Sequence, residues 1–235
     1  MKVYIAEKPS QGREIASVLG CTKSAKGYMY NADSIVVWCF GHLIEMADFS
    51  SYSPELKKWQ LSILPFIPQE WKYVPKKDAV EQLKIIANCL TKASEVVIAT
   101  DADREGELIA RLVLNHCNYS GPARRLWVSD LNPEAIRKAL SNMKDIKEYD
   151  NLYKSALARS RADLIAGVNY TRACTIVYGS SNSIYSIGRV QSPTLRLVVE
   201  RDLEIEAFKA NGFYTIKGYF VNTLLLDNPI EANWI

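Results

Sequence analysis

The chain has 235 residues, of which 48% are hydrophobic, so it can bury the core of one large or two small domains, and intrinsic disorder is excluded. The net charge of +3 is unevenly distributed, because residues 151–199 contain one acid, Asp163, against six basic residues: Lys154, Arg159, Arg161, Arg172, Arg189 and Arg196. A basic segment in an otherwise slightly acidic chain suggests a site for a polyanion.

The five cysteines form no CxxC pair and no even framework, so neither a zinc ribbon nor a disulfide scaffold is indicated, and a reducing compartment fits best. The first ten residues, MKVYIAEKPS, carry charges before any apolar segment of signal-peptide length. No apolar run approaches the ~20 residues that a membrane helix needs. We therefore expect a cytoplasmic protein without a membrane partner.

Strand and helix patterns alternate through the first 145 residues. Short apolar runs predict strands at 3–6, 34–40, 95–100 and 124–128. Helical spacing of apolar residues, with its start and stop signals, predicts helices at 9–19, 79–90, 106–116 and from 133 onward. Such alternation indicates parallel βαβ units, and hence an α/β fold.

The other segments have different patterns. Residues 49–77 are rich in proline and aromatic residues without a period, and predict an irregular insertion. Residues 151–179 predict one long helix or two, residues 180–188 a loop, and residues 192–208 a further helix. Residues 213–221 alternate like a strand. The predicted fold is a parallel-sheet domain followed by a mainly helical domain.

Four acids follow the strand pattern in VVIATDADREGELIA, residues 96–110: Asp101, Asp103, Glu105 and Glu107. Alternate residues of an extended chain point to the same side, so Asp101 and Asp103 can face one point. Glu7 follows the first strand in the same way, and it faces these acids if the two strands are neighbours. Several carboxylate oxygens at one place suit Mg²⁺.

A simpler reading stays open, because acids at the start of a helix are also favoured by capping and by the helix dipole. Lys8, taken alone, is typical of a solvated lysine. His42 is flanked by apolar residues, which favours a satisfied core histidine over a catalytic base.

Four motifs, in this order, carry a family resemblance: IAEKPS at 5–10, DADREGELIA at 101–110, RADLIAGVNYTRA at 161–173 and SIGRVQSPTLRLVVERD at 186–202. Together the chain resembles the amino-terminal part of type IA DNA topoisomerases, most closely the topoisomerase III branch. The resemblance implies a Toprim domain at 1–148, a helical domain for single-stranded DNA at 149–210, and a strand at 211–235 that begins an incomplete further domain.

The resemblance also implies roles for the acidic cluster. Asp101, Asp103 and Glu105, with Glu7, are expected to bind Mg²⁺. Glu7 is expected at the scissile phosphate, where it exchanges a proton with the 3′ oxygen, and Lys8 is expected to stabilise charge on the phosphoryl group. These roles agree with what phosphoryl transfer requires.

For DNA, the resemblance implies contacts from residues that are dispersed in the sequence: Trp59, Arg161, Arg172, Ser186, Ile187, Gly188, Arg189, Val190 and Gln191. Arginine binds phosphate with two parallel hydrogen bonds, and an aromatic ring stacks on any base. For Trp59 an alternative stays open, since loop tryptophans often pack on their own loop. Asp163, the one acid in the segment, is expected to orient an arginine.

The implied function is strand cleavage and religation by an enzyme of the type IA topoisomerase family, with Mg²⁺ as cofactor. The family's nucleophilic tyrosine lies in a later domain, and this chain stops at Ile235 before reaching it. We therefore expect the chain alone to be inactive and to need further domains in cis or in trans. Two alternatives remain: a stand-alone Toprim nuclease, and a non-catalytic module that binds single-stranded DNA.

Overall fold

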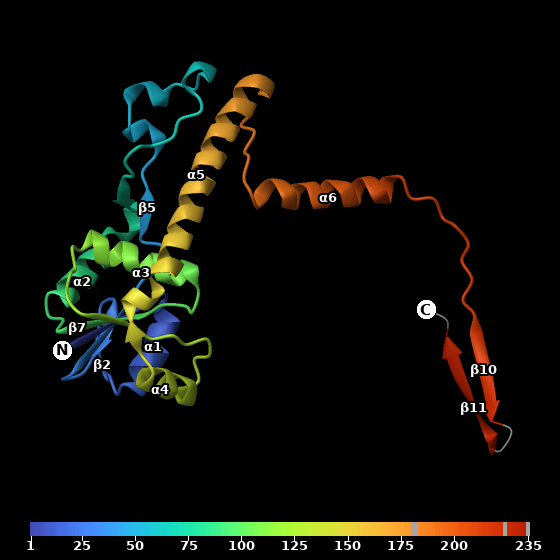
Figure 1. Ribbon diagram of the computed structural model, residues 1–235, viewed down its shortest axis with the longest axis horizontal. Helices are drawn as coiled ribbons and strands as arrows, with labels where there is room; N and C mark the ends of the chain where they lie inside the picture. The colour runs from blue at the N-terminus through green and yellow to red at the C-terminus, as the bar shows by residue number, and fades with distance from the viewer. Residues whose placement is uncertain (180–182, 223–224, 234–235) are drawn as a thin grey trace. The chain divides into compact units, whose positions relative to one another are not determined.

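The computed structural model describes residues 1–179, 183–222 and 225–233 of the chain (Figure 1). Its contacts divide it into two compact units, Met1–Arg189 and Val190–Ile235. The first unit contains, in order, β1 (Lys2–Ala6), α1 (Pro9–Val18), β2 (Lys23–Ala25), β3 (Tyr28–Tyr30), β4 (Ser34–Trp38), β5 (Ile44–Met46), β6 (Tyr73–Pro75), α2 (Val80–Leu90), β7 (Glu95–Ala99), α3 (Arg104–His116), β8 (Ala123–Arg125), α4 (Pro133–Ser141), β9 (Lys144–Asp145) and α5 (Asp150–Tyr178).

The core of this unit is a seven-stranded sheet with the order β2-β3-β4-β1-β7-β8-β9. Its middle strands β4, β1, β7 and β8 are parallel, as the sequence predicts, whereas β2, β3 and β9 pair antiparallel at the two edges. The edge strands were not predicted, because each has three residues or fewer and none is an apolar buried run. The pairing of Ala6 with Ala99 confirms that the first strand and the strand before the acids are neighbours.

Helices cover both faces of the sheet (Figure 1). Val3 and Ile5 of β1 pack in one apolar cluster with α2 and α3, and Tyr4 and Ala6 pack in the other with α1 and α4. The strands β4, β1 and β7 are buried on both faces, and their sequences are therefore almost continuously apolar. With helices on both sides of the sheet, the domain has three layers and is of the α/β class, as predicted.

Some element bounds differ from those predicted. The segment predicted at 151–179 as one helix or two is the single helix α5, which begins at Asp150 and ends at Tyr178. β8 ends at Arg125, three residues early, although the Leu126 N–H still donates to the Ile98 carbonyl at 2.8 Å. Of the predicted loop at 180–188, residues 183–188 have no regular structure and residues 180–182 lie outside the described residues.

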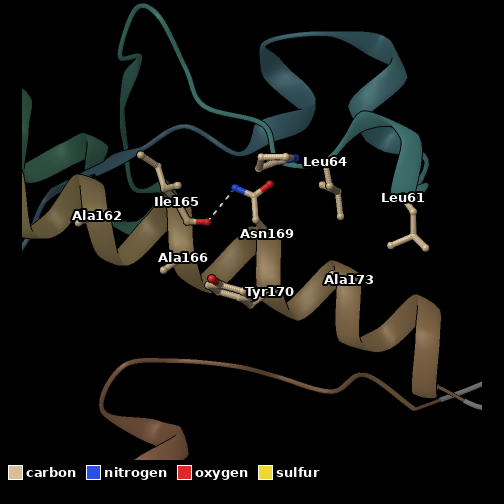
Figure 2. A pocket seen from close by; sticks show the side chains of 9 residues that line it. Leu61, Leu64, Ala162, Ile165, Ala166, Asn169, Tyr170 and Ala173 are labelled. Carbon is tan, nitrogen blue, oxygen red and sulfur yellow. Dashed lines mark hydrogen bonds between the residues drawn. The ribbon is translucent and has the colours of Figure 1, made fainter.

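The insertion predicted at 49–77 is irregular as expected. It contains three 3-10 turns, η1 (Phe49–Ser51), η2 (Pro54–Lys57) and η3 (Leu61–Ile63), and ends in β6, which pairs with β5. The side chain of Asn169 on α5 binds both backbone polar groups of Phe66 in the insertion. Its Oδ1 accepts from Phe66 N–H at 2.7 Å, and its Nδ2 donates to Phe66 O at 2.9 Å. Figure 2 shows Leu61 and Leu64 beside α5, where they line an apolar pocket of about 660 Å³.

The second unit contains α6 (Gln191–Glu206) and an antiparallel hairpin of β10 (Lys217–Asn222) and β11 (Leu225–Asn233). β10 begins four residues later than the sequence predicts. The predicted domain boundaries at 148 and 210 remain predictions, since compactness alone does not define a domain. None of the helices in the described ranges is long and apolar enough to cross a membrane.

Candidate functional site

Glu7 and Asp101 lie side by side at the carboxyl edge of the sheet. Glu7 directly follows β1 and Asp101 comes two residues after the end of β7, and the two parallel strands pair Ala6 with Ala99. The Asp101 N–H donates to Glu7 Oε2 at 3.1 Å, and the Gly41 N–H donates to the Glu7 carbonyl at 3.0 Å. The structure therefore brings together the two acidic motifs that the sequence singles out.

Gln11 joins these two acids, and sequence reasoning missed it. Its side chain is buried; its Oε1 accepts from the Glu7 N–H at 2.7 Å and its Nε2 donates to Asp101 Oδ1 at 2.9 Å. The sequence did contain a sign of its burial, because Gln11 is four residues before the apolar Ile15 and so lies on the same, buried face of α1. A polar residue on a buried helix face needs partners, and here they are site residues.

Lys8 is also at the site. Its Nζ lies 3.2 Å from Asp101 Oδ2, and both side chains are partly exposed. Lys8 is therefore more than a solvated lysine, since it places a cation at the carboxylate that the sequence nominates as a metal ligand.

Asp103 and Glu105 do not converge on Asp101. Asp103 caps α3, because its Oδ1 accepts from the Gly106 N–H at 2.7 Å, and Glu105 Oε2 lies 3.6 Å from His42 Nε2. Across residues 1–179, 183–222 and 225–233, no three His, Cys, Asp or Glu side chains are arranged to hold a metal ion. In this structure the Asp103 side chain therefore caps the helix, which is the alternative that the sequence left open.

The donor set nevertheless fits a hard divalent cation. Carboxylate oxygens are the ligands that Mg²⁺ prefers, and it keeps several waters, so two or three carboxylates suffice. Asp103 and Glu105 are exposed residues on a backbone fixed beside Asp101, so rotation of their side chains can direct them toward it.

His42 is not the core histidine that its apolar neighbours predict. Its side chain is about one-third exposed and faces Glu105 at the site. Burial lowers the pKa of His42, and the adjacent Glu105 carboxylate opposes that shift. The apolar neighbours misled because Leu43 and Ile44 turn into the core while His42 lies on the loop just before β5.

The pKa of Glu7 is raised. Partial burial is the main cause, and the nearby carboxylates of Asp101 and Asp103 raise it further, whereas the hydrogen bond from the Asp101 N–H and the charge of Lys8 lower it. In the metal-free protein Glu7 therefore binds a proton more readily than an exposed glutamate does.

Glu107, the fourth acid of the motif, points away from the site. It is fully buried, with Oε1 accepting from Arg111 Nε at 2.8 Å and Oε2 lying 3.0 Å from Nε of the equally buried Arg125. Arg111 also binds Asp150 of α5 at 2.9 Å. Glu107 is therefore part of an internal ion-pair network beneath the site.

Arg172 and Arg161, expected to face DNA, hold the insertion against α5. Arg172 is 4% exposed, lies over the rings of Phe49 and Trp59 at 5.6 and 5.4 Å, and donates to Leu56 O at 2.8 Å. Arg161 lies 4.9 Å over the ring of Trp71 and donates to the Tyr73 hydroxyl at 3.2 Å. The sequence could not show this, because the partners lie 88 to 123 residues away in the chain.

Arg189 is exposed and pairs with Asp163, as predicted for that acid. Its Nη2 donates to Asp163 Oδ2 at 3.0 Å, and its Nε donates to Oδ1. Asp163 thus fixes the orientation of a guanidinium that remains open to solvent on part of its surface. The pair lowers the pKa of Asp163, because the guanidinium donates hydrogen bonds to its carboxylate.

Several of the other predicted DNA residues gather at one hollow. A pocket of about 340 Å³ is lined by ten residues, among them Trp59, Arg172, Ser186 and Ile187. Ile187 is held to α5 by its N–H, which donates to Thr171 Oγ1 at 2.9 Å. Gly188 follows in the same irregular segment, whereas Val190 and Gln191 belong to the second unit.

Comparisons with known proteins agree with this arrangement. Residues 2–131 match the family model described as the Toprim domain, and residues 147–229 match the one described as DNA topoisomerase. DNA topoisomerase 3 of Bacillus subtilis (strain 168) is 42% identical over 217 residues, which are 92% of this chain and 29% of that protein. DNA topoisomerase 3 of Staphylococcus epidermidis is 42% identical over 226 residues, 94% of this chain and 31% of that protein.

Among solved structures, full-length topoisomerase I from Thermotoga maritima is similar with a TM-score of 0.60 and 25% identity. The match covers 92% of this chain and 32% of that chain. The chain thus spans about a third of the length of the relatives that it matches. These matches confirm the resemblance that the four motifs indicate.

Proposed function

This chain belongs to the Toprim family, and we propose that it supplies the acidic half of a DNA strand cleavage and religation site, as part of a type IA DNA topoisomerase. One observation carries the proposal: Glu7 and Asp101 are hydrogen-bonded at the ends of adjacent parallel strands, with Lys8 beside them. In open α/β sheets, ligands bind at this edge.

In the proposed site, Asp101, Asp103 and Glu105, with Glu7, would hold Mg²⁺, which would supply charge neutralisation at phosphate oxygens. Lys8 Nζ adds a positive charge for a non-bridging oxygen once it leaves Asp101. Glu7 would be the carboxyl group that exchanges a proton with the leaving 3′ oxygen in cleavage and religation. Gln11, hydrogen-bonded to both Glu7 and Asp101, would hold these two residues at a fixed separation during proton transfer.

We expect Asp103→Asn to weaken Mg²⁺ binding at least tenfold, since even loss of a partner behind a metal ligand weakens binding about 10–100-fold. Asparagine retains an oxygen that can cap α3, so the helix start is preserved while the charge is removed. The measurement is an Mg²⁺ titration followed by backbone amide shifts of residues 99–108.

Asp33→Ala is the matched control for this titration. Asp33 directly precedes β4, so it lies at the opposite edge of the parallel strands and its replacement should leave the Mg²⁺ response unchanged. Equal responses of the wild type and Asp103→Asn would remove the metal site from the proposal.

We also propose that the first unit binds single-stranded DNA. The support is the hollow lined by Trp59, Ser186 and Ile187, with the exposed Arg189 next in the same segment. Trp59 is 39% exposed, so one part of its ring is available for a base while the Arg172 guanidinium lies over it. Stacking of bases and charge on phosphates together are typical of strand-binding grooves.

Single-stranded DNA is expected to bind about tenfold or more tightly than a duplex, because stacking of one unpaired base contributes about 1–3 kcal/mol that a closed duplex cannot supply. Fluorescence anisotropy with a labelled 12-nucleotide strand and a hairpin of the same length measures the ratio. Trp59→Ala should reduce the ratio, and Val80→Ala, an apolar residue of similar exposure outside the hollow, is the control. Equal affinity for both DNA forms contradicts the proposal.

A further inference from the structure

Arg125 stands out because it is a fully buried arginine directly beneath the candidate site. It is the last residue of β8, and its side chain crosses under the carboxyl end of β7. A buried guanidinium is strongly unfavourable unless its charge and its five donors find partners. The identity of those partners therefore shows what the residue is for.

One partner is the carbonyl of the next residue, Leu126, at 2.9 Å, and the others are backbone carbonyls where β7 ends and the acidic loop begins. Arg125 Nη1 donates to Ile98 O at 3.1 Å and to Thr100 O at 2.9 Å, and its Nη2 donates to Asp101 O. The chain leaves the sheet here, so the Thr100 and Asp101 carbonyls have no strand ladder to join. The guanidinium supplies the donors that a neighbouring strand would otherwise provide to these carbonyls.

The same loop is closed from its other side by α3. Thr100 Oγ1 donates to Gly106 O at 2.8 Å, and the Asp103 N–H donates to Asp101 O at 2.9 Å. A Cβ on Gly106 would lie 2.4 Å from Asp101 O, so only glycine lets the helix start approach this carbonyl. Asp101 O is thus held by Arg125, by Asp103 N–H and by contact with Gly106.

The arginine itself is fixed from behind. Glu107 Oε2 lies 3.0 Å from its Nε, and the ring of Trp127 lies 5.0 Å from its guanidinium carbon. Trp127 is stacked in turn on Tyr149, with ring centroids 5.1 Å apart. Arg125 therefore has few orientations open to it and can impose its own geometry on the loop.

We propose that Arg125 is a positioning residue, which sets the backbone of Asp101 and Asp103 so that their carboxylates can share one ligand. This inference rests on the proposed function for the identity of that ligand, Mg²⁺. Arg125 does not touch substrate or metal, because its donors are directed at carbonyls below the carboxylates. Its contribution is the placement of two ligands before the metal arrives.

The test compares Arg125→Lys with Arg124→Lys, the neighbouring position on β8. Lysine at 125 keeps the charge for Glu107 but lacks the planar fork that reaches several carbonyls at once. Arg124 also forms a two-point pair, with Glu95 at 2.7 and 2.9 Å, but this pair lies at the amino end of β7, away from the acidic loop. Each variant is measured for Mg²⁺ affinity by amide shifts and, without metal, for amide hydrogen exchange at Asp103 and Gly106.

We expect Arg125→Lys to bind Mg²⁺ about tenfold more weakly and to exchange the Asp103 amide faster in metal-free protein, with Arg124→Lys unchanged in both. A folded Arg125→Lys with wild-type affinity and wild-type exchange overturns the inference. If wild-type protein shows no Mg²⁺ response, the proposed metal site fails, and the exchange measurement alone decides whether Arg125 orders the loop.

Gly106→Ala decides the question if Arg125→Lys does not fold. It displaces the same Asp101 carbonyl by a methyl group and leaves Arg125 and every charge in place. Weaker Mg²⁺ binding and faster exchange of the Asp103 amide support the positioning role. Wild-type behaviour of folded Gly106→Ala overturns it.

Discussion

Glu107→Ala is expected to lower the free energy of unfolding by about 3–5 kcal/mol. The substitution leaves Arg125 fully buried without its counter-charge, and it removes one of the two carboxylates that bind Arg111. Removing one partner of a buried pair is far more damaging than removing a surface pair, because the remaining charge cannot return to water. The expected loss is a large part of a typical domain's stability.

Urea denaturation followed by far-ultraviolet circular dichroism measures this change. Glu107→Gln should fall between wild type and Glu107→Ala, because the amide can still accept a hydrogen bond but carries no charge. Glu81→Ala is the control, since Glu81 pairs with Lys26 in an exposed position, and its midpoint should not move. A Glu107→Ala midpoint equal to that of the control would mean that water reaches Arg125.

The α/β architecture could be predicted because its cause is local. Strands buried on both faces must be continuous apolar runs, and the helices between them show apolar residues at helical spacing, so each element is legible in its own residues. The pairing of β1 with β7 was only a condition in the sequence reasoning, and the structure supplies it. The short antiparallel edge strands escaped, because three residues give no period.

The acidic motif shows where such reasoning stops. Asp101, Asp103, Glu105 and Glu107 form one cluster in the sequence, yet Glu107 lies four residues after Asp103 on the inner face of α3 and never faces the site. The helical period of the apolar residues after it, Leu108, Leu112 and the residues between, was the available signal. Its partner Arg125 is far away in sequence, so no local pattern could assign the pair.

The arginines of the basic segment show the same limit in another form. A count of charges does not show that an arginine also holds two segments of the protein together, as Arg172 and Arg161 do, and their contact with DNA stays a prediction. Arg189 is exposed and keeps part of its guanidinium toward solvent. Burial thus divides a group of residues that the sequence treats as one.

Arg172→Ala and Arg189→Ala are both expected to weaken binding of single-stranded DNA by roughly tenfold, but for different reasons. Arg172 orients Trp59 from within the protein, so its loss removes the stacking surface, a matter of about 1–3 kcal/mol for one base. Arg189 can reach a phosphate directly, and loss of a charge-assisted hydrogen bond has an effect of similar size, about 1.5–3 kcal/mol. Affinity at a single salt concentration therefore cannot separate the two roles.

The salt dependence of binding separates them. Each phosphate contact on a single strand contributes about −0.7 to the slope of log K against log[salt], because counterions are released. Arg189→Ala should reduce the slope by about that amount and leave the urea midpoint of the free protein unchanged. Arg172→Ala should keep the slope and lower the midpoint, because it removes the contacts with Phe49, Trp59 and the Leu56 carbonyl. A reduced slope for Arg172→Ala with an unchanged midpoint would place its guanidinium on the DNA and contradict its assignment as an internal support.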